Sequence, residues 1–236
     1  NIGLGSRLDA IDLLKKMPAD FRIETGLRPL LNSDDLEVRL RTVEALAYRN
    51  DPIIKKFSID KKFDLILVPS NHNMVYVTQT GWPRIILTGQ IEIERPLTLS
   101  TWSNRLLVKE IEDNPNMLEV RYRDIETQTT INETITPDLP SFAIFLAHRP
   151  NPESPAPGLN LSYSRTIGAI HSLWREQYLN ADFKVEQDRL LAVIQRLAGE
   201  TSYTPRPDFG DVSETEGSRY IDESTPVVTE VEESIQ

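Results

Sequence analysis

The chain has 236 residues, 39% of them hydrophobic, and a formal net charge of −10, which allows one large domain or two small ones. It contains no cysteine, which excludes disulfides, zinc–thiolate sites and cysteine nucleophiles. No run of about 18 apolar residues occurs, so the sequence predicts no membrane span.

Residues 1–56 form a predicted helical segment. Ser6 can cap a helix that runs to about Met17, and a second helical stretch covers residues 23–32. A third helix follows Ser33 or Asp34 as its cap and ends before Asn50-Asp51-Pro52, with Leu46 among its core-facing residues.

The third helix resembles the second helix of a HEAT-type repeat. In that family a loop aspartate and a helix arginine, here Asp34 and Arg39, brace neighbouring repeats. One repeat cannot bury its apolar face alone, so the resemblance predicts further repeats before residue 1. An ordinary helical hairpin is the alternative.

Residues 57–136 form a predicted antiparallel β module. Three short runs rich in Val, Ile, Leu, Tyr and Thr are separated by turn residues, and they span Phe63–Val68, Met74–Thr78 and Arg84–Thr88. Further short strands are predicted over residues 91–94, 98–100, 105–111, 118–123 and 129–134. Their number and spacing favour a small sandwich or a partly open barrel.

Residues 137–199 form a predicted C-terminal helical segment. One helix runs from Pro137 to Arg149, a second from Ser162 or Ser164 to about Leu179, and a last one over residues 185–198. Between the first two, residues 150–158 hold four prolines and predict an extended linker or loop. The sequence therefore predicts an α+β fold.

The final segment, residues 200–236, is an acidic tail. It holds ten acidic and two basic residues, a net charge of −8, which leaves about −2 for the body. Because it cannot bury enough apolar area to offset chain entropy, we expect it to be disordered. A nearly neutral body argues against nucleic acid as a partner.

No catalytic, metal or cofactor site is predicted. The histidines are His72, His148 and His171, and no two of them have metal-ligand spacing. G-x-S-x-G and a complete glycine-rich phosphate loop are both missing, so neither a small-molecule substrate nor a cofactor is expected. Trp82 and Trp102 lie at predicted turns, where they either contact a partner protein or cap the end of a small barrel.

One combination of segments goes beyond composition. A helix ending in VEALAYRNDPII leads directly into the strands around residues 63–89, and SYSRTIGAIHSLWREQYLNADFKVE follows later. This order resembles the C-terminal region of planctomycete-type flagellar basal-body P-ring-like proteins. The residues that match the β motif of that family are Met74, Val75, Tyr76, Thr78, Pro83, Arg84, Ile85 and Gly89.

The resemblance covers roughly residues 30–190, and the chain departs from the family at Leu87-Thr88-Gly89, where the family usually has an aromatic residue before the glycine. It implies a periplasmic, non-enzymatic assembly module whose partners are neighbouring repeats or subunits of a larger structure. The alternative is a HEAT-β adaptor that binds another protein through the sheet edge, the Pro-rich loop or the acidic tail.

Overall fold

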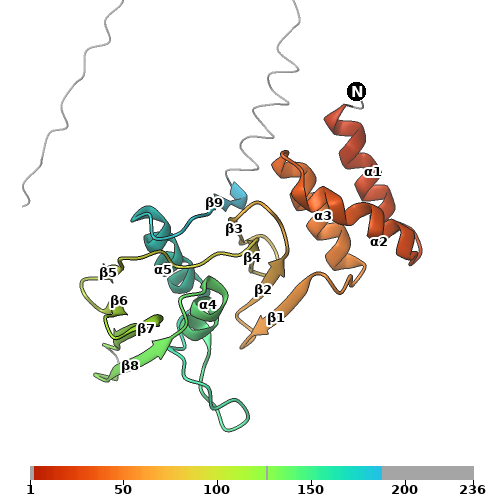
Figure 1. The fold of residues 1–236 in the computed structure, drawn as a ribbon. Helices are drawn as coiled ribbons and strands as arrows, with labels where there is room; N and C mark the ends of the chain where they lie inside the picture. The colour runs from red at the N-terminus through yellow and green to blue at the C-terminus, as the bar shows by residue number, and fades with distance from the viewer. Residues whose placement is uncertain (1–2, 126, 188–236) are drawn as a thin grey trace, which may run out of the picture. The chain divides into compact units, whose positions relative to one another are not determined.

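A computed structural model describes residues 3–125 and 127–187, and it shows an α+β protein (Figure 1). Within these residues there are five α-helices, one 3-10 helix and two β-sheets. The helices are α1 (Leu4–Lys16), α2 (Phe21–Leu27), the 3-10 helix η1 (Arg28–Asn32), α3 (Leu36–Tyr48), α4 (Leu139–Ala147) and α5 (Tyr163–Arg175). No helix among them is long and apolar enough to cross a membrane.

The first sheet has five strands in the order β1-β2-β4-β3-β9. Their bounds are β1 (Lys55–Ile59), β2 (Phe63–Val68), β3 (Met74–Thr78), β4 (Arg84–Thr88) and β9 (Asp182–Val185). β2 pairs with β4 in parallel, and β3 pairs with β9 in parallel, whereas β1–β2 and β3–β4 are antiparallel. The sheet is therefore mixed.

The second sheet is a four-stranded antiparallel meander in the order β5-β6-β7-β8. Its strands are β5 (Thr98–Thr101), β6 (Leu106–Ile111), β7 (Asn114–Arg123) and β8 (Thr130–Ile135). Leu118, Val120 and Tyr122 are buried and alternate with more exposed charged residues, as a strand with one covered face requires.

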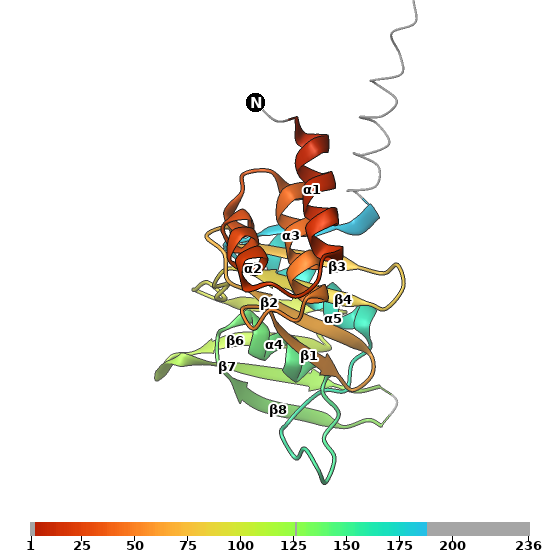
Figure 2. The same cartoon turned by 90° about the vertical axis from the view of Figure 1, so that its right-hand side faces the viewer.

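Both faces of the central strands β2, β3 and β4 are covered, which explains why these three strands are nearly continuous in apolar residues. On one face Ile66, Met74 and Tyr76 pack against α1–α3. On the other face Leu65 and Val77 join a core that includes α4, α5 and the second sheet. Figure 2 shows α1–α3 on one side of the first sheet and β6–β8 on the other.

The caps of the helices follow from local chemistry. Asp20 begins α2 by accepting the backbone N–H of Arg22, and Asp35 begins α3 by accepting those of Glu37 and Val38. The expected cap, Ser33 or Asp34, was therefore one or two residues early. Leu46 is fully buried, as predicted.

The β module was predicted wrongly in two respects. It is not antiparallel throughout, because β4 inserts between β2 and β3. Of the two expected architectures, a sandwich or a partly open barrel, the described residues form two sheets and no closed barrel. Residues 91–94 make only isolated bridges, Glu92 to Asp138 and Ile93 to Leu179, because their neighbours are loop and helix-flanking segments.

The segment 137–199 was also misread in part. Val185, the expected start of a final helix, is instead the last residue of β9, which completes the first sheet beside β3, and the next two residues, Glu186 and Gln187, are helical. The rest of that expected helix from residue 188 and the expected disordered tail lie outside the described residues. α4 and α5 confirm the other two predicted helices, although α5 ends at Arg175, before the expected Leu179.

Candidate functional site

The parallel pairing of β2 and β4 creates the site. Val68 and Thr88 are partners in the register, so the carboxyl ends of both strands lie at the same end of the sheet. Met74, the first residue of β3, pairs with Thr88 and with Asp182 at the same level. Polar residues that follow β2 and β4 or precede β3 therefore gather at this end of the sheet. Sheets with parallel strands commonly bind ligands outside the carboxyl ends of those strands.

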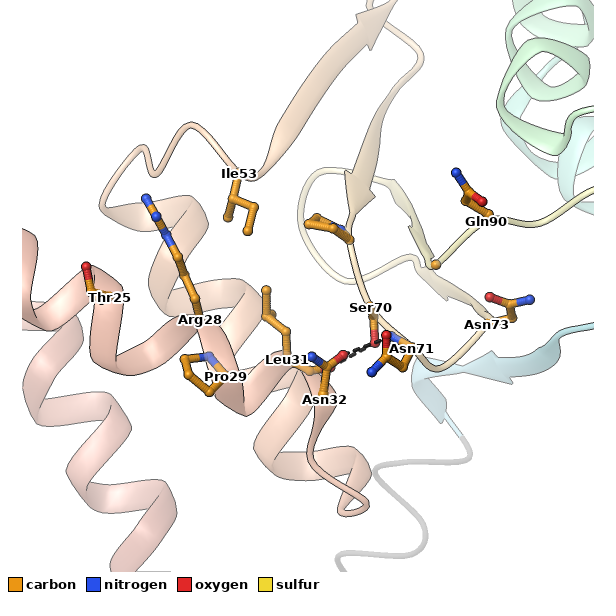
Figure 3. Close-up of a pocket in the computed structure, with 12 residues that line it drawn as sticks. Thr25, Arg28, Pro29, Leu31, Asn32, Ile53, Ser70, Asn71, Asn73 and Gln90 are labelled. Carbon is orange, nitrogen blue, oxygen red and sulfur yellow. Dashed lines mark hydrogen bonds between the residues drawn. The ribbon is translucent and has the colours of Figure 1, made fainter.

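An open groove of about 960 Å³ lies at this end of the sheet. Arg28 and Asn32 belong to its helical wall, while Asn71, Asn73 and Gln90 belong to its sheet wall (Figure 3). The helical wall comes from α2 and η1, and the sheet wall comes from the β2–β3 turn and the residues after β4. Segments about 40 residues apart in sequence thus build one surface.

Hydrogen bonds hold the β2–β3 turn against η1. The Ser70 hydroxyl donates to the carbonyl oxygen of Leu31 at 2.9 Å and accepts the backbone N–H of His72 at 3.1 Å. The backbone N–H of Asn71 donates to the side-chain oxygen of Asn32 at 2.8 Å. Asn71 is exposed beside this contact and lines the groove.

Gly89 permits the close approach of β4 to the same turn. Its φ is +78°, a conformation that side chains other than glycine rarely adopt. A Cβ atom there would lie 2.1 Å from the side-chain oxygen of Asn73 and 3.1 Å from the carbonyl oxygen of Ser70. A glycine is therefore needed at this position in the wall of the groove.

A second hollow, of about 500 Å³, lies on the other side of the turn and shares Asn71 and Asn73 with the groove. Arg39 lines it and is only 8% exposed, and its Nη1 donates to the carbonyl oxygens of Ser33 and Asp34. Arg39 thus binds the backbone of the loop before α3, and these contacts differ from the expected brace, in which the Asp34 carboxylate pairs with Arg39.

Side-chain amides line both walls of the groove. Each carboxamide offers two N–H donors and one carbonyl acceptor, which matches the donor and acceptor of a peptide group. Arg28 is neutralised by Asp51, with Nε–Oδ2 and Nη2–Oδ1 distances of 3.1 Å. Among the described residues no group of three His, Asp or Glu could hold a metal ion. The groove is thus suited to a polar, uncharged backbone.

The family-motif residues are spread over the first sheet. Met74 and Tyr76 are buried beneath α1–α3, and Ile85 is buried on the opposite face. Gly89 alone belongs to the groove. Thr78, Pro83 and Arg84 lie at the opposite end of the strands, and the carbonyl oxygens of Thr78 and Arg84 both accept from the Tyr163 hydroxyl.

Burial raises the pKa of Tyr163 to about 12, and the nearby Glu186 carboxylate acts in the same direction, whereas the charge of Arg84 acts against it. The hydroxyl therefore stays protonated and acts as a structural donor that joins α5 to β3 and β4. No proton transfer near neutral pH follows from such a value.

The two tryptophans differ in environment. Trp82, at the tip of the β3–β4 turn, is 49% exposed. Trp102 is partly buried and packs against the core between the two sheets, with Gly168 of α5 beside its ring. Trp82 is therefore the more accessible of the two for contact with a partner.

One cluster has the residue types of a hydrolase triad. His148 Nδ1 lies 3.4 Å from the Asp60 carboxylate, and His148 Nε2 lies 3.3 Å from the Ser154 hydroxyl. However, Nε2 is also 3.1 Å from the carbonyl oxygen of Ser154, which can only accept a hydrogen bond. A nitrogen that donates there cannot take the serine proton, so the cluster ties the Pro-rich loop to the β1–β2 turn.

Sequence reasoning missed the groove. The sequence predicts only turn residues between Val68 and Met74, and no functional prediction falls on Arg28, Asn32 or Gln90. The available signal was the density of amides directly beside strand ends, Asn71 and Asn73 before β3 and Gln90 after β4. His72 and His171 remain apart from any metal-ligand set in the described residues, and His171 stacks near Trp174 and Phe183.

Comparisons with models of known protein families, with curated proteins and with solved structures find no match to this chain.

Proposed function

We propose that this protein is a non-enzymatic assembly module that holds an extended segment of a partner protein in the groove at the β2–β3 turn. The observation that carries the proposal is the set of amides on both sides of the turn: Asn32, Asn71, Asn73, Gln90 and Asn180. An extended chain exposes one N–H and one C=O per residue, and carboxamides can pair with both.

Apolar groups in the groove provide contacts for side chains of the bound segment. Pro29 and Leu31 contribute from η1, Ile53 from the approach to β1, and Pro69 from the end of β2. Binding sites of this kind combine apolar surface with a few placed polar groups that fix orientation. The absence of net charge in the groove, given the Arg28–Asp51 pair, favours an uncharged stretch of the partner.

The N-terminal helices supply a second contact surface within this proposal. Leu13, Met17, Phe21 and Tyr48 are 45–72% exposed, although they are large apolar residues. A HEAT-like repeat that stacks on a neighbour presents such a face. This exposure supports the reading of residues 1–56 as a HEAT-like unit beside further repeats or subunits.

The identity of the larger assembly is proposed on the resemblance alone. The motif over residues 74–89 supports a flagellar P-ring-like structure in the periplasm, and its homo-oligomeric context comes from the same family. The alternative is a HEAT-β adaptor outside any ring, with the same groove. Both place protein partners at the groove and require neither a cofactor nor a small-molecule substrate.

The experiment selects peptides from a phage-displayed library of random linear sequences on the immobilised full chain. Selected peptides are then titrated against the Asn71→Ala/Gln90→Ala variant by fluorescence anisotropy. We expect at least a tenfold loss of affinity in this variant. Gln79→Ala, which removes an exposed amide from the opposite end of β3, serves as the matched control and should leave affinity unchanged.

Two outcomes would count against the proposal. Selection that enriches no peptide would argue against polypeptide binding. Peptides whose affinity falls equally in the groove variant and in the Gln79→Ala control, or in neither, would place binding elsewhere on the protein. Circular dichroism of the three proteins verifies that the substitutions leave the fold intact.

A further inference from the structure

The outer edge of β1 is open in the described part of the chain. β1 ends the order of the first sheet and pairs only with β2. Residues Lys55–Ser58 are all exposed. Among them Phe57 is a large apolar residue, and its 42% exposure to water is unfavourable unless another surface covers it. An unpaired edge presents free N–H and C=O groups that can accept another strand.

The side chains of β1 alternate in character. Lys55 and Phe57 project to one face of the sheet, the face of Leu65 and Leu67, while Lys56 and Ser58 project to the other. Lys56 Nζ lies 2.8 Å from the buried Asp64 carboxylate. Because Lys56 is already paired with Asp64, a complementary strand would need above all an acidic residue opposite Lys55 and an apolar residue opposite Phe57.

The C-terminal segment of the chain contains this pattern. It reads Thr229-Glu230-Val231-Glu232-Glu233, within the segment that carries a net charge of −8. In an antiparallel alignment Val231 lies opposite Phe57, Glu232 opposite Lys56 and Glu233 opposite Lys55. Opposite charges and apolar pairs directly across two strands stabilise a sheet.

We infer that Thr229–Glu233 of a second copy of this chain adds to the outer edge of β1 as an antiparallel strand in this register. Reciprocal exchange lets each of two copies donate one strand and receive one, which closes the assembly at two copies. This surface is separate from the groove, so the inference does not depend on the proposed function.

The absence of native cysteine allows a direct test. One full-length chain carries Phe57→Cys and a second carries Val231→Cys, and the two are mixed and oxidised. Residues directly opposite on paired strands lie within the Cα distance that a disulfide spans. We expect a disulfide-linked heterodimer at least tenfold above the yield from Phe57→Cys mixed with Glu232→Cys, whose side chain faces the other side of the strand.

Charge reversal tests the register independently of the cysteines. Lys55→Glu in the Phe57→Cys chain should lower the heterodimer yield severalfold, and Glu233→Lys in the Val231→Cys chain should restore it. Light scattering of the unmodified protein should show a mass of twice 26.9 kDa that falls toward 26.9 kDa in Lys55→Glu.

Three results would overturn the inference. Equal yields from the Val231→Cys and Glu232→Cys chains would refute the register. Failure of Glu233→Lys to restore the yield would refute the charge pairing. A disulfide that forms within one chain carrying both Phe57→Cys and Val231→Cys, with none in the mixture, would rule out exchange between copies.

Discussion

Arg28 binds the buried carboxylate of Asp51 through Nε and Nη2, each at 3.1 Å. The Asp51 side chain has no exposed surface, whereas that of Arg28 is 32% exposed and lines the groove. Asp51 also accepts the backbone N–H of Ile53 at 2.9 Å. The pair thus joins η1 to the segment that leads into β1 and sets the position of the helical wall.

Asp51→Ala should lower the free energy of unfolding by about 2–4 kcal/mol, because it leaves Arg28 and the N–H of Ile53 without their buried acceptor. Urea denaturation followed by circular dichroism measures the change. Asp12→Ala is the matched control: Asp12 pairs with Arg41, both more than a third exposed, and its loss should cost less than about 1 kcal/mol. Equal costs would contradict the role given to Asp51.

Leu46→Ala should cost about 2–5 kcal/mol, because Leu46 is fully buried between the helices and the first sheet. Arg39→Ala should cost about 1–3 kcal/mol, because Arg39 is buried and donates to two loop carbonyl oxygens. Thermal and urea unfolding measure both. Arg22→Ala, a change at an exposed residue, should have almost no effect, and a cost matching that of Arg39→Ala would refute this assignment.

Tyr163→Phe should destabilise the protein by about 1–3 kcal/mol at neutral pH, because it removes the donor shared by the carbonyl oxygens of Thr78 and Arg84. The ring itself remains, so its packing against Phe63, with a centroid distance of 5.3 Å, should persist. Tyr178→Phe is the control, since its hydroxyl makes a single exposed contact at 3.4 Å. Equal effects of the two changes would argue against the buried donor.

Tyr163 should also shape stability at alkaline pH. Its folded pKa of about 12 lies above the ordinary value of 10, so the folded state retains the proton longer than the unfolded state. The contribution is complete below pH 10 and is lost as pH rises from about 10 through 12. The wild-type stability curve should therefore fall more steeply than that of Tyr163→Phe in this window, and identical slopes would contradict the raised pKa.

Glu186 should make stability sensitive to acid. Burial opposes its ionisation, but the N–H groups of Thr80 and Gln79, the Thr80 hydroxyl and Arg84 together hold its pKa below the ordinary value. Its contribution is present above about pH 4.5 and is lost as pH falls through the lowered pKa. Glu186→Gln should be less stable than wild type at neutral pH, and the difference should vanish at low pH. A difference that persists there would exclude the ionised carboxylate as its source.

The sequence predicted local strand positions well and their partners poorly. The bounds of β2, β3 and β4 match the expected runs residue for residue, because breakers such as Pro69 and Gly81 mark their ends. Local alternation and turn residues say nothing about which strand lies beside which. The insertion of β4 between β2 and β3 follows from tertiary packing on both faces of the sheet, which no local pattern encodes.

β9 and the groove escaped prediction for related reasons. The strand Asp182–Val185 has four residues and a pattern too short to distinguish from the start of a helix. It is a strand because β3 offers it an edge. The groove depends on the contact of η1 with the β2–β3 turn, and Ser70 and Asn71 acquire their partners only when that contact forms.

The place of β9 in the first sheet has a consequence for synthesis on the ribosome. β3 and its inner neighbour β4 leave the exit tunnel early, but the outer neighbour of β3, β9, ends at Val185, 97 residues after the end of β4 at Thr88. At about 5–20 residues per second, that interval lasts roughly 5–20 s. During this time the nascent chain carries β3 without its outer neighbour, which makes β3 a candidate contact for chaperones until translation reaches β9.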